Sequence, residues 1–159
     1  MDALYLQQYI EEHLPVVARN GLVITDCTDH LVTVEGNYLD HINHVQTVFG
    51  GSISMALTVA AWAHVRSMMD ELADQVAIVV RRQFVEFDRP VKADFRAVTS
   101  KHADEEIETF LQKFEQTGKA RLTVHAVLYA GDEACARFEG QFVVLRKAGH
   151  PAFGGGFEQ

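Results

Sequence analysis

The sequence from Asn43 to Ser52 reads Asn-His-Val-Gln-Thr-Val-Phe-Gly-Gly-Ser, and an apolar run from Ile53 to Val65 follows it directly. A polar loop therefore enters two glycines, and the glycines enter a helix that is apolar on nearly every side. The first N–H groups of a helix lack partners within it, and the helix dipole places positive charge at the same end. We therefore expect the helix N-terminus at Gly50-Gly51 to bind an anion, or a carbonyl oxygen that becomes negative during a reaction.

The composition of the whole chain is that of a soluble globular protein. Its 159 residues are 48% hydrophobic and 23% charged, which predicts one domain with a sizeable core. The net charge of -8 and the pI of about 5.4 argue against nucleic acid as the main partner, although one phosphorylated small ligand needs only a local basic patch. The N-terminus lacks the features of a signal peptide, and the run from Ile53 to Val65 is shorter than the roughly 20 residues that span a bilayer. We expect no membrane span and a cytoplasmic location.

No cofactor is expected from the cysteines and histidines. Cys27 and Cys135 are isolated thiols without motif spacing, typical of small buried hydrophobic residues. His41 and His44 lie close together in the loop, but a metal ion needs three or four ligands and no third is evident nearby.

Hydrophobic periodicity predicts the order helix, hairpin, long helix, strand, strand, helix, strand, strand. The expected helices cover residues 1–19, with Pro15 ending or kinking the first, then 51–72 and 104–117. The expected strands cover 22–27, 31–35, 76–87, 91–97, 122–128 and 134–144. We expect one domain over residues 1–147 and a disordered Gly-rich tail over 148–159.

The long helix decides how these elements assemble. A helix that is apolar all round must be covered all round. A curved antiparallel sheet of about six strands, wrapped around the helix, is the economical α+β solution. Such a sheet leaves an edge strand open, and dimerisation through that edge is the natural remedy.

This pattern resembles the hot-dog fold, in which a sheet wraps a central helix and two subunits join their sheets. The resemblance runs from about residue 20 to 147. Asn43, Gln46 and Phe49-Gly50-Gly51 look like the entry loop of hot-dog acyl thioesterases, and Phe87-Asp88-Arg89-Pro90 looks like the turn between the two strands that follow the helix. The second helix between strands, and Gly-Gly-Ser leading to Ala61-Trp62, are most similar to the thioesterase domain found at the C-terminus of YiiD-like acetyltransferase fusions.

The resemblance implies hydrolysis of an acyl thioester carried by coenzyme A or acyl carrier protein, in a homodimer or a dimer of dimers. Gly50 and Gly51 would then polarise the thioester carbonyl, and Asn43 or Gln46 would orient the water or hold the loop. Thr58 occupies the helix position where acid-dependent members carry Asp or Glu. The remaining substrate-binding candidates around the loop are His44, Phe49 and Ser52.

The general base is unassigned. Thr58, at the position of the carboxylate, can hydrogen-bond a water, but a hydroxyl is a poor base at neutral pH. The candidates for the base are His44, His41, Asp40, His64 and a partner's Glu86. The chain therefore remains open to two other interpretations. The first is a non-catalytic acyl-thioester binder or carrier-protein partner. The second is a hot-dog dehydratase, and the absence of a carboxylate between Ile53 and Met69 disfavours it.

A basic group follows the central helix in the sequence. Arg81, Arg82, Arg89 and Lys92 either form a solvated face paired with nearby carboxylates, or bind the phosphates of coenzyme A or an acidic carrier protein. Arg81 and Arg82 are the substrate-binding candidates in this group.

Overall fold

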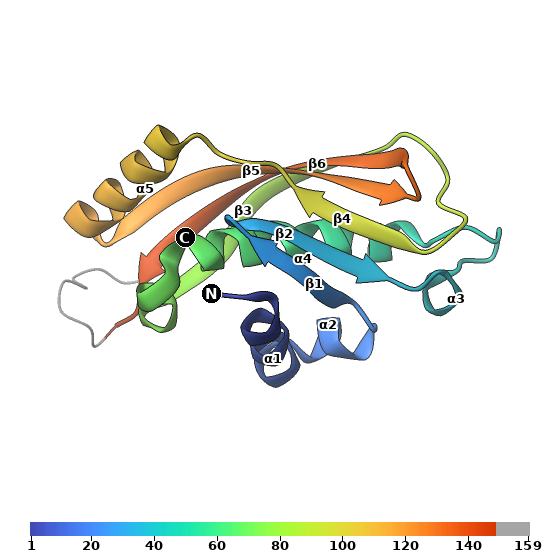
Figure 1. The fold of residues 1–159 in the computed structure, drawn as a ribbon, viewed down its shortest axis with the longest axis horizontal. Coiled ribbons are helices and arrows are strands. Elements are labelled where there is room, and N and C mark those ends of the chain that lie inside the picture. The colour runs from blue at the N-terminus through green and yellow to red at the C-terminus, as the bar shows by residue number, and fades with distance from the viewer. Residues whose placement is uncertain (149–159) are drawn as a thin grey trace.

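The computed structural model describes residues 1–148, in which six strands form one antiparallel sheet and a long helix lies against it (Figure 1). The elements, in chain order, are α1 (Ala3–His13), α2 (Pro15–Arg19), β1 (Val23–Thr28), β2 (Leu31–Gly36), α3 (Tyr38–His41), α4 (Gly50–Met69), the 3-10 helix η1 (Asp70–Gln75), β3 (Val76–Phe87), β4 (Phe95–Thr99), α5 (Asp104–Thr117), β5 (Lys119–Ala130) and β6 (Glu133–Arg146). The strand order is β1-β2-β4-β5-β6-β3. The expected curved sheet around a central helix, the hot-dog arrangement, is confirmed.

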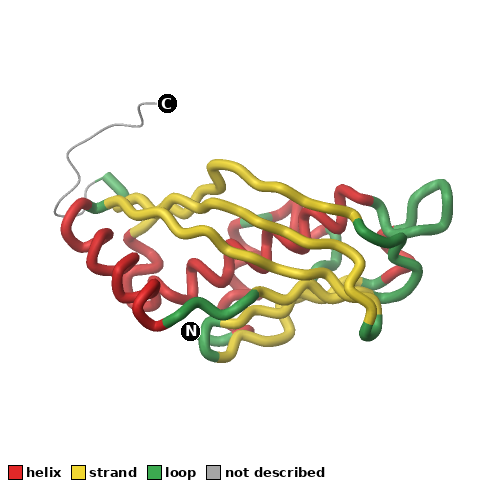
Figure 2. The backbone as a smooth tube through the Cα atoms, turned by 90° about the horizontal axis from the view of Figure 1, so that it is seen from above, coloured by secondary structure: helices red, strands yellow, loops and turns green. Residues whose placement is uncertain are grey.

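The central helix α4 is buried because its sequence is apolar on most sides. Fourteen of its twenty residues are buried, and it packs against all six strands (Figure 2). The six exceptions lie on one narrow stripe at helical spacing, which consists of Gly50, Gly51, Ser54, Met55, Thr58 and Trp62. This stripe is the part of α4 that a ligand can reach.

The N-terminal helices close one end of that stripe. The expected first helix is divided at Pro15: α1 ends at His13 and α2 begins at Pro15. A proline favours this break because it lacks the N–H that would continue the helix. The ring of Tyr9 in α1 stacks on Trp62 with 5.7 Å between centroids, and the Arg66 guanidinium lies 3.6 Å from the Tyr9 ring centroid. Arg66 is buried and also donates to the Ala73 carbonyl and the Asp74 carboxylate.

Two strands differ from the sequence-based expectation. The strand expected from Val91 begins only at Phe95, because the Val91 carbonyl accepts from the Val48 N–H at 2.8 Å and ties this segment to the loop before α4. β3 does not neighbour β4 but pairs with β6, so that it forms an edge of the sheet. The expected tail over 148–159 lies outside the described residues, apart from Ala148, and the single domain over 1–147 stays a prediction.

Candidate functional site

The N-terminus of α4 presents two free backbone donors. Its N-cap residue Phe49 makes no side-chain cap hydrogen bond. The N–H groups of Ser52 and Ile53 both donate to the Phe49 carbonyl, at 2.9 and 3.1 Å. Within residues 1–148, the N–H groups of Gly50 and Gly51 have no acceptor. Two adjacent donors at the positive end of a 20-residue helix form a site for a polarised oxygen.

Two aromatic rings frame these donors. The Phe49 and Phe87 side chains are 58% and 55% exposed, which is high for such large apolar groups. A Cβ atom added to Gly51 would lie 2.3 Å from the Phe49 ring, whereas one added to Gly50 would lie 3.5 Å from the Phe87 ring, an ordinary contact. Gly51 is therefore glycine because Phe49 packs over it. The site therefore combines two apolar rings with the two polar N–H groups between them.

The loop before α4 is held by Asn43. Its side-chain oxygen accepts from the N–H groups of Val45 and Thr47, at 3.0 and 3.1 Å, and its amide nitrogen donates to the Thr47 hydroxyl at 2.9 Å. Every polar atom of the side chain is thus engaged within the loop. Of the two roles expected for Asn43, this geometry supports holding the loop.

The other loop candidates differ in their positions. Ser52 is nearly buried in the first turn of α4, where its hydroxyl lies 2.9 Å from Nδ1 of His41. Gln46 has a positive φ of 61° and its carbonyl accepts from the Tyr38 hydroxyl. The side chains of His44 and Gln46 are exposed and make no hydrogen bond within the described residues.

Thr58 lies on the accessible stripe of α4 and contacts a residue that the sequence analysis did not single out. Its hydroxyl oxygen is 2.7 Å from the Ser54 carbonyl and 3.0 Å from the side-chain amide of Gln83 in β3. Gln83 was missed because an exposed glutamine in a strand has no motif. The contact between Gln83 and Thr58 follows only from the packing of β3 against α4 in the folded chain.

The structure separates the basic residues that are close in the sequence. Arg82 pairs across the sheet with Gln141, whose neighbour Phe142 points into the core, so Arg82 lies on the face away from α4. Arg81 donates to the Gln141 side chain at 2.9 Å, whereas Arg89 pairs with Glu133 at the start of β6. Arg81 and Arg82 in β3 therefore have a different neighbour from Arg89, which lies near Lys92 at another hollow.

Two of the candidate bases lie away from the glycine pair within one protomer. Glu86 pairs with Arg137 at 3.2 Å, on the outer face of the sheet. His64 is buried near the far end of α4, hydrogen-bonded to Thr99 and His102. Burial and, secondarily, the neighbouring His102 lower the pKa of His64 to about 4. His64 is therefore a neutral core residue.

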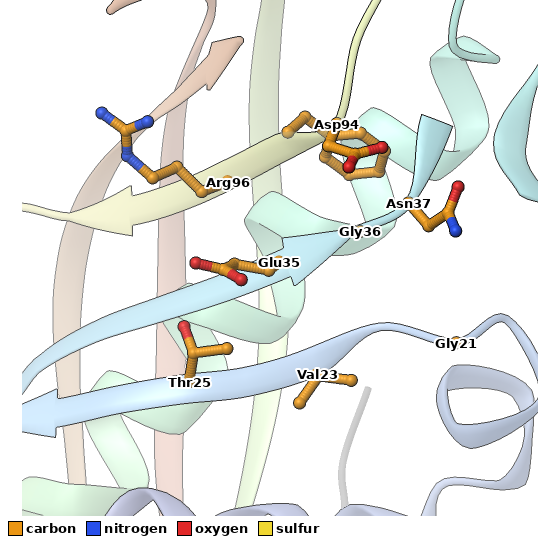
Figure 3. A pocket seen from close by; sticks show the side chains of 9 residues that line it. Gly21, Val23, Thr25, Glu35, Gly36, Asn37, Asp94 and Arg96 are labelled. Carbon is orange, nitrogen blue, oxygen red and sulfur yellow. The ribbon is translucent and has the colours of Figure 1, made fainter. Parts of the chain in front are cut away.

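A separate hollow lies at the other edge of the sheet (Figure 3). It measures about 480 Å³ and includes Glu35, Asp94 and Arg96 on neighbouring strand ends. Two of its three ionic groups have partners: Asp94 accepts from the Tyr38 N–H, and Arg96 donates to the Gly131 carbonyl. None of the predicted site residues line it.

Residues 1–148 contain neither a group of three metal-ligating side chains nor a helix long and apolar enough to cross a membrane.

Comparison with known proteins points to one family. A family model described as "Putative thioesterase (yiiD_Cterm)" matches residues 3–146. Among curated proteins, none matches the chain.

Solved structures share the fold. A protein of unknown function from Chlorobaculum tepidum is 26% identical, with a TM-score of 0.81 over 91% of this chain and 94% of that one. A structure from Shewanella oneidensis, described as a putative thioesterase, is 23% identical with a TM-score of 0.80, over 90% and 96% of the two chains. A probable thioesterase from Pseudomonas aeruginosa is 18% identical with a TM-score of 0.77, over 92% and 97%.

Proposed function

The chain belongs to the family described as putative thioesterase (yiiD_Cterm), and on that premise we propose that it hydrolyses an acyl thioester of coenzyme A or acyl carrier protein. The observation that carries this proposal is the pair of free N–H groups at Gly50 and Gly51. Attack of water on a thioester carbonyl places negative charge on its oxygen, and two preorganised backbone donors stabilise that charge. Removal of one such donor typically costs ~100–1000-fold in rate.

The roles of the neighbouring residues follow from their positions. Phe49 and Phe87 exclude water from the carbonyl and contact the apolar part of the substrate. Asn43 holds the loop that positions Phe49, and the buried contact between Ser52 and His41 fixes the first helical turn. We expect His44 and Gln46, which are exposed on the same loop, to contact the substrate or its carrier.

We also propose that the working unit is a homodimer joined through β3. This edge strand is twelve residues long and exposes Val79, Val80, Phe84 and Phe87. A long apolar edge with unpaired backbone groups favours pairing with a second copy. Arg81 and Arg82 would then lie at the junction of the two sheets, where they could reach the phosphates of a carrier bound to the partner.

One observation favours a second candidate function, binding of acyl thioesters without turnover. The accessible stripe of α4 carries Thr58 but no carboxylate, so the helix supplies no general base. A chain of this kind would retain the ligand site and lack the proton acceptor.

The two functions are separated by measuring release and binding on the same sample. Purified protein is mixed with coenzyme A and carrier-protein esters of short, medium and long acyl chains, and the free thiol is detected while thermal stability is recorded. Hydrolysis predicts thiol release above the uncatalysed rate for at least one ester. Stabilisation by an ester without thiol release would instead identify a binding protein.

A further inference from the structure

The geometry points to Gln83 as the residue that positions the attacking water, held in place by Thr58. This inference rests on the hydrolysis proposed above and adds a residue from β3 to the site on α4. It begins from the short contacts of the Thr58 hydroxyl.

One hydroxyl proton cannot serve both neighbours of Thr58. The Ser54 carbonyl can only accept a hydrogen bond, and it lies closer, at 2.7 Å, than the Gln83 amide at 3.0 Å. The Thr58 proton therefore goes to Ser54, which leaves the Thr58 oxygen as an acceptor. The structure places Oε1 of Gln83 at this contact, where it would compete with Ser54 for the one hydroxyl proton. Because the two ends of an amide have nearly the same shape and the hydrogen bonds decide between them, we assign the NH₂ group of Gln83 to this position, where it donates to the Thr58 oxygen.

This orientation turns the Gln83 carbonyl oxygen away from Thr58. Gln83 pairs across the sheet with Gly140, which lies between the core residues Phe138 and Phe142, so the Gln83 side chain projects toward α4. Gln83 is exposed. Phe87, four residues further along the same strand, is also exposed, and its ring lies beside Gly50 in α4. The Gln83 amide thus lies beside the accessible stripe that leads to the glycine pair.

The spacing matches the reaction. Thr58 lies eight positions after Gly50, which is about 12 Å along the helix axis. The reacting atoms span a distance of this order. They are the carbonyl oxygen bound to the glycine N–H groups, the carbonyl carbon, and the water bound to Gln83, with hydrogen bonds of about 3 Å at each end.

The chemistry assigned to Gln83 is orientation and not proton removal. One O–H of the water donates to the Gln83 oxygen, which aims a lone pair of the water at the carbonyl carbon. The water oxygen bonds to that carbon, the C–S bond breaks, and its electron pair leaves on the thiolate sulfur. The two water protons are shared between the acid and the thiol products through solvent. An amide cannot take the proton at neutral pH, so Gln83 orients the water and is not the general base.

Substitutions of Gln83 test this role by kinetics. Gln83→Ala should lower kcat about tenfold or more with little change in KM, because the water loses its orientation while the ester still binds. Gln83→Glu should place a carboxylate beside the water. It should raise kcat and add an acid limb to its pH profile, in which activity falls as pH drops through the pKa of the new group. Gln112→Glu, the same change on exposed α5, should leave both unchanged.

The support by Thr58 is tested with a matched pair. Thr58→Ser keeps the hydroxyl and should retain kcat, whereas Thr58→Val removes the acceptor and should resemble Gln83→Ala. Thermal melting of each variant checks that the fold is intact. An active wild type with Gln83→Ala within about twofold of it, or a Gln83→Glu pH profile identical to wild type, overturns the role of Gln83 alone. A wild type that releases no thiol from any ester overturns both this role and the proposed hydrolysis.

Discussion

At the scale of single residues, the site depends on which polar atoms have partners and which do not. Asn43 has every side-chain polar atom engaged within its loop, while the N–H groups of Gly50 and Gly51, within the described residues, have no acceptor. Free donors at the positive end of a long helix mark a place where a ligand completes the hydrogen bonding.

The two glycines should respond differently to the same substitution. Gly51→Ala forces the Phe49 ring to move, because the new Cβ would lie 2.3 Å from it, and should lower kcat/KM by about tenfold to 100-fold. Gly50→Ala meets Phe87 at an ordinary 3.5 Å and should have a much smaller effect. Steady-state kinetics with one acyl-CoA ester compares them. Equal losses in the two variants would contradict a role for the Phe49 contact.

His64 predicts how stability depends on pH. The pKa of its buried imidazole is lowered to about 4, whereas in the unfolded chain it returns to about 6.5. Between these values the unfolded state binds more protons, so stability is complete above pH 6.5 and is lost as pH falls toward 4. The free energy of unfolding should drop by about 2 kcal/mol between pH 7 and pH 5 through this group.

Urea unfolding at the two pH values measures this drop. His64→Asn removes the titrating group and should flatten the pH dependence, although the variant is less stable at pH 7. Equal slopes in wild type and variant would show that His64 is not the group responsible.

At the scale of elements, the sequence predicts the helices and most strands because their patterns are local. The apolar run after Gly50 predicts α4, and the spacing of Ile107, Phe110, Leu111 and Phe114 predicts α5. The start of β4 was wrong because the bond between Val48 and Val91 joins segments far apart in the chain.

The site was predicted only as far as its motif extends. The loop and the glycine pair follow from the sequence, since both lie in one segment of ten residues. Gln83 does not, because its contact with Thr58 depends on which strand lies beside α4. The position of Arg81 and Arg82 on an edge strand does not follow from the sequence either, because the neighbours of β3 depend on the order of strands in the sheet.

The contact between α1 and α4 gives a prediction on stability. Arg66 stacks on Tyr9 and donates to two oxygens of η1, a combination that needs a planar guanidinium. Arg66→Lys should lower the free energy of unfolding by about 2 kcal/mol in urea denaturation. Arg121→Lys, at an exposed position of β5, should change it little. A similar result for both variants would show that the stacking contributes nothing.

At the scale of the whole molecule, the two edges of the sheet are not equivalent. β1 has six residues, while β3 has twelve and exposes a row of apolar side chains. We expect a second copy to cover β3, so that two sheets join and two glycine pairs lie in one particle.

Matched substitutions on the two edges test this expectation. Val79 in β3 and Val23 in β1 are both 43% exposed. Val79→Lys should shift the particle mass from twice the 17.8 kDa chain toward one chain, because an inserted lysine opposes strand pairing. Val23→Lys should leave it unchanged. Light scattering after gel filtration gives the mass, and a monomeric wild type would contradict the β3 dimer.

The central claim is that Gly50 and Gly51 hold the thioester carbonyl. It is tested most directly by a crystal structure with an acyl-CoA ketone analogue, in which a methylene group replaces the sulfur and prevents hydrolysis. The account predicts the carbonyl oxygen about 2.7–3.1 Å from the amide nitrogens of Gly50 and Gly51, between the rings of Phe49 and Phe87. A carbonyl oxygen bound elsewhere, with both N–H groups still facing solvent, would contradict it.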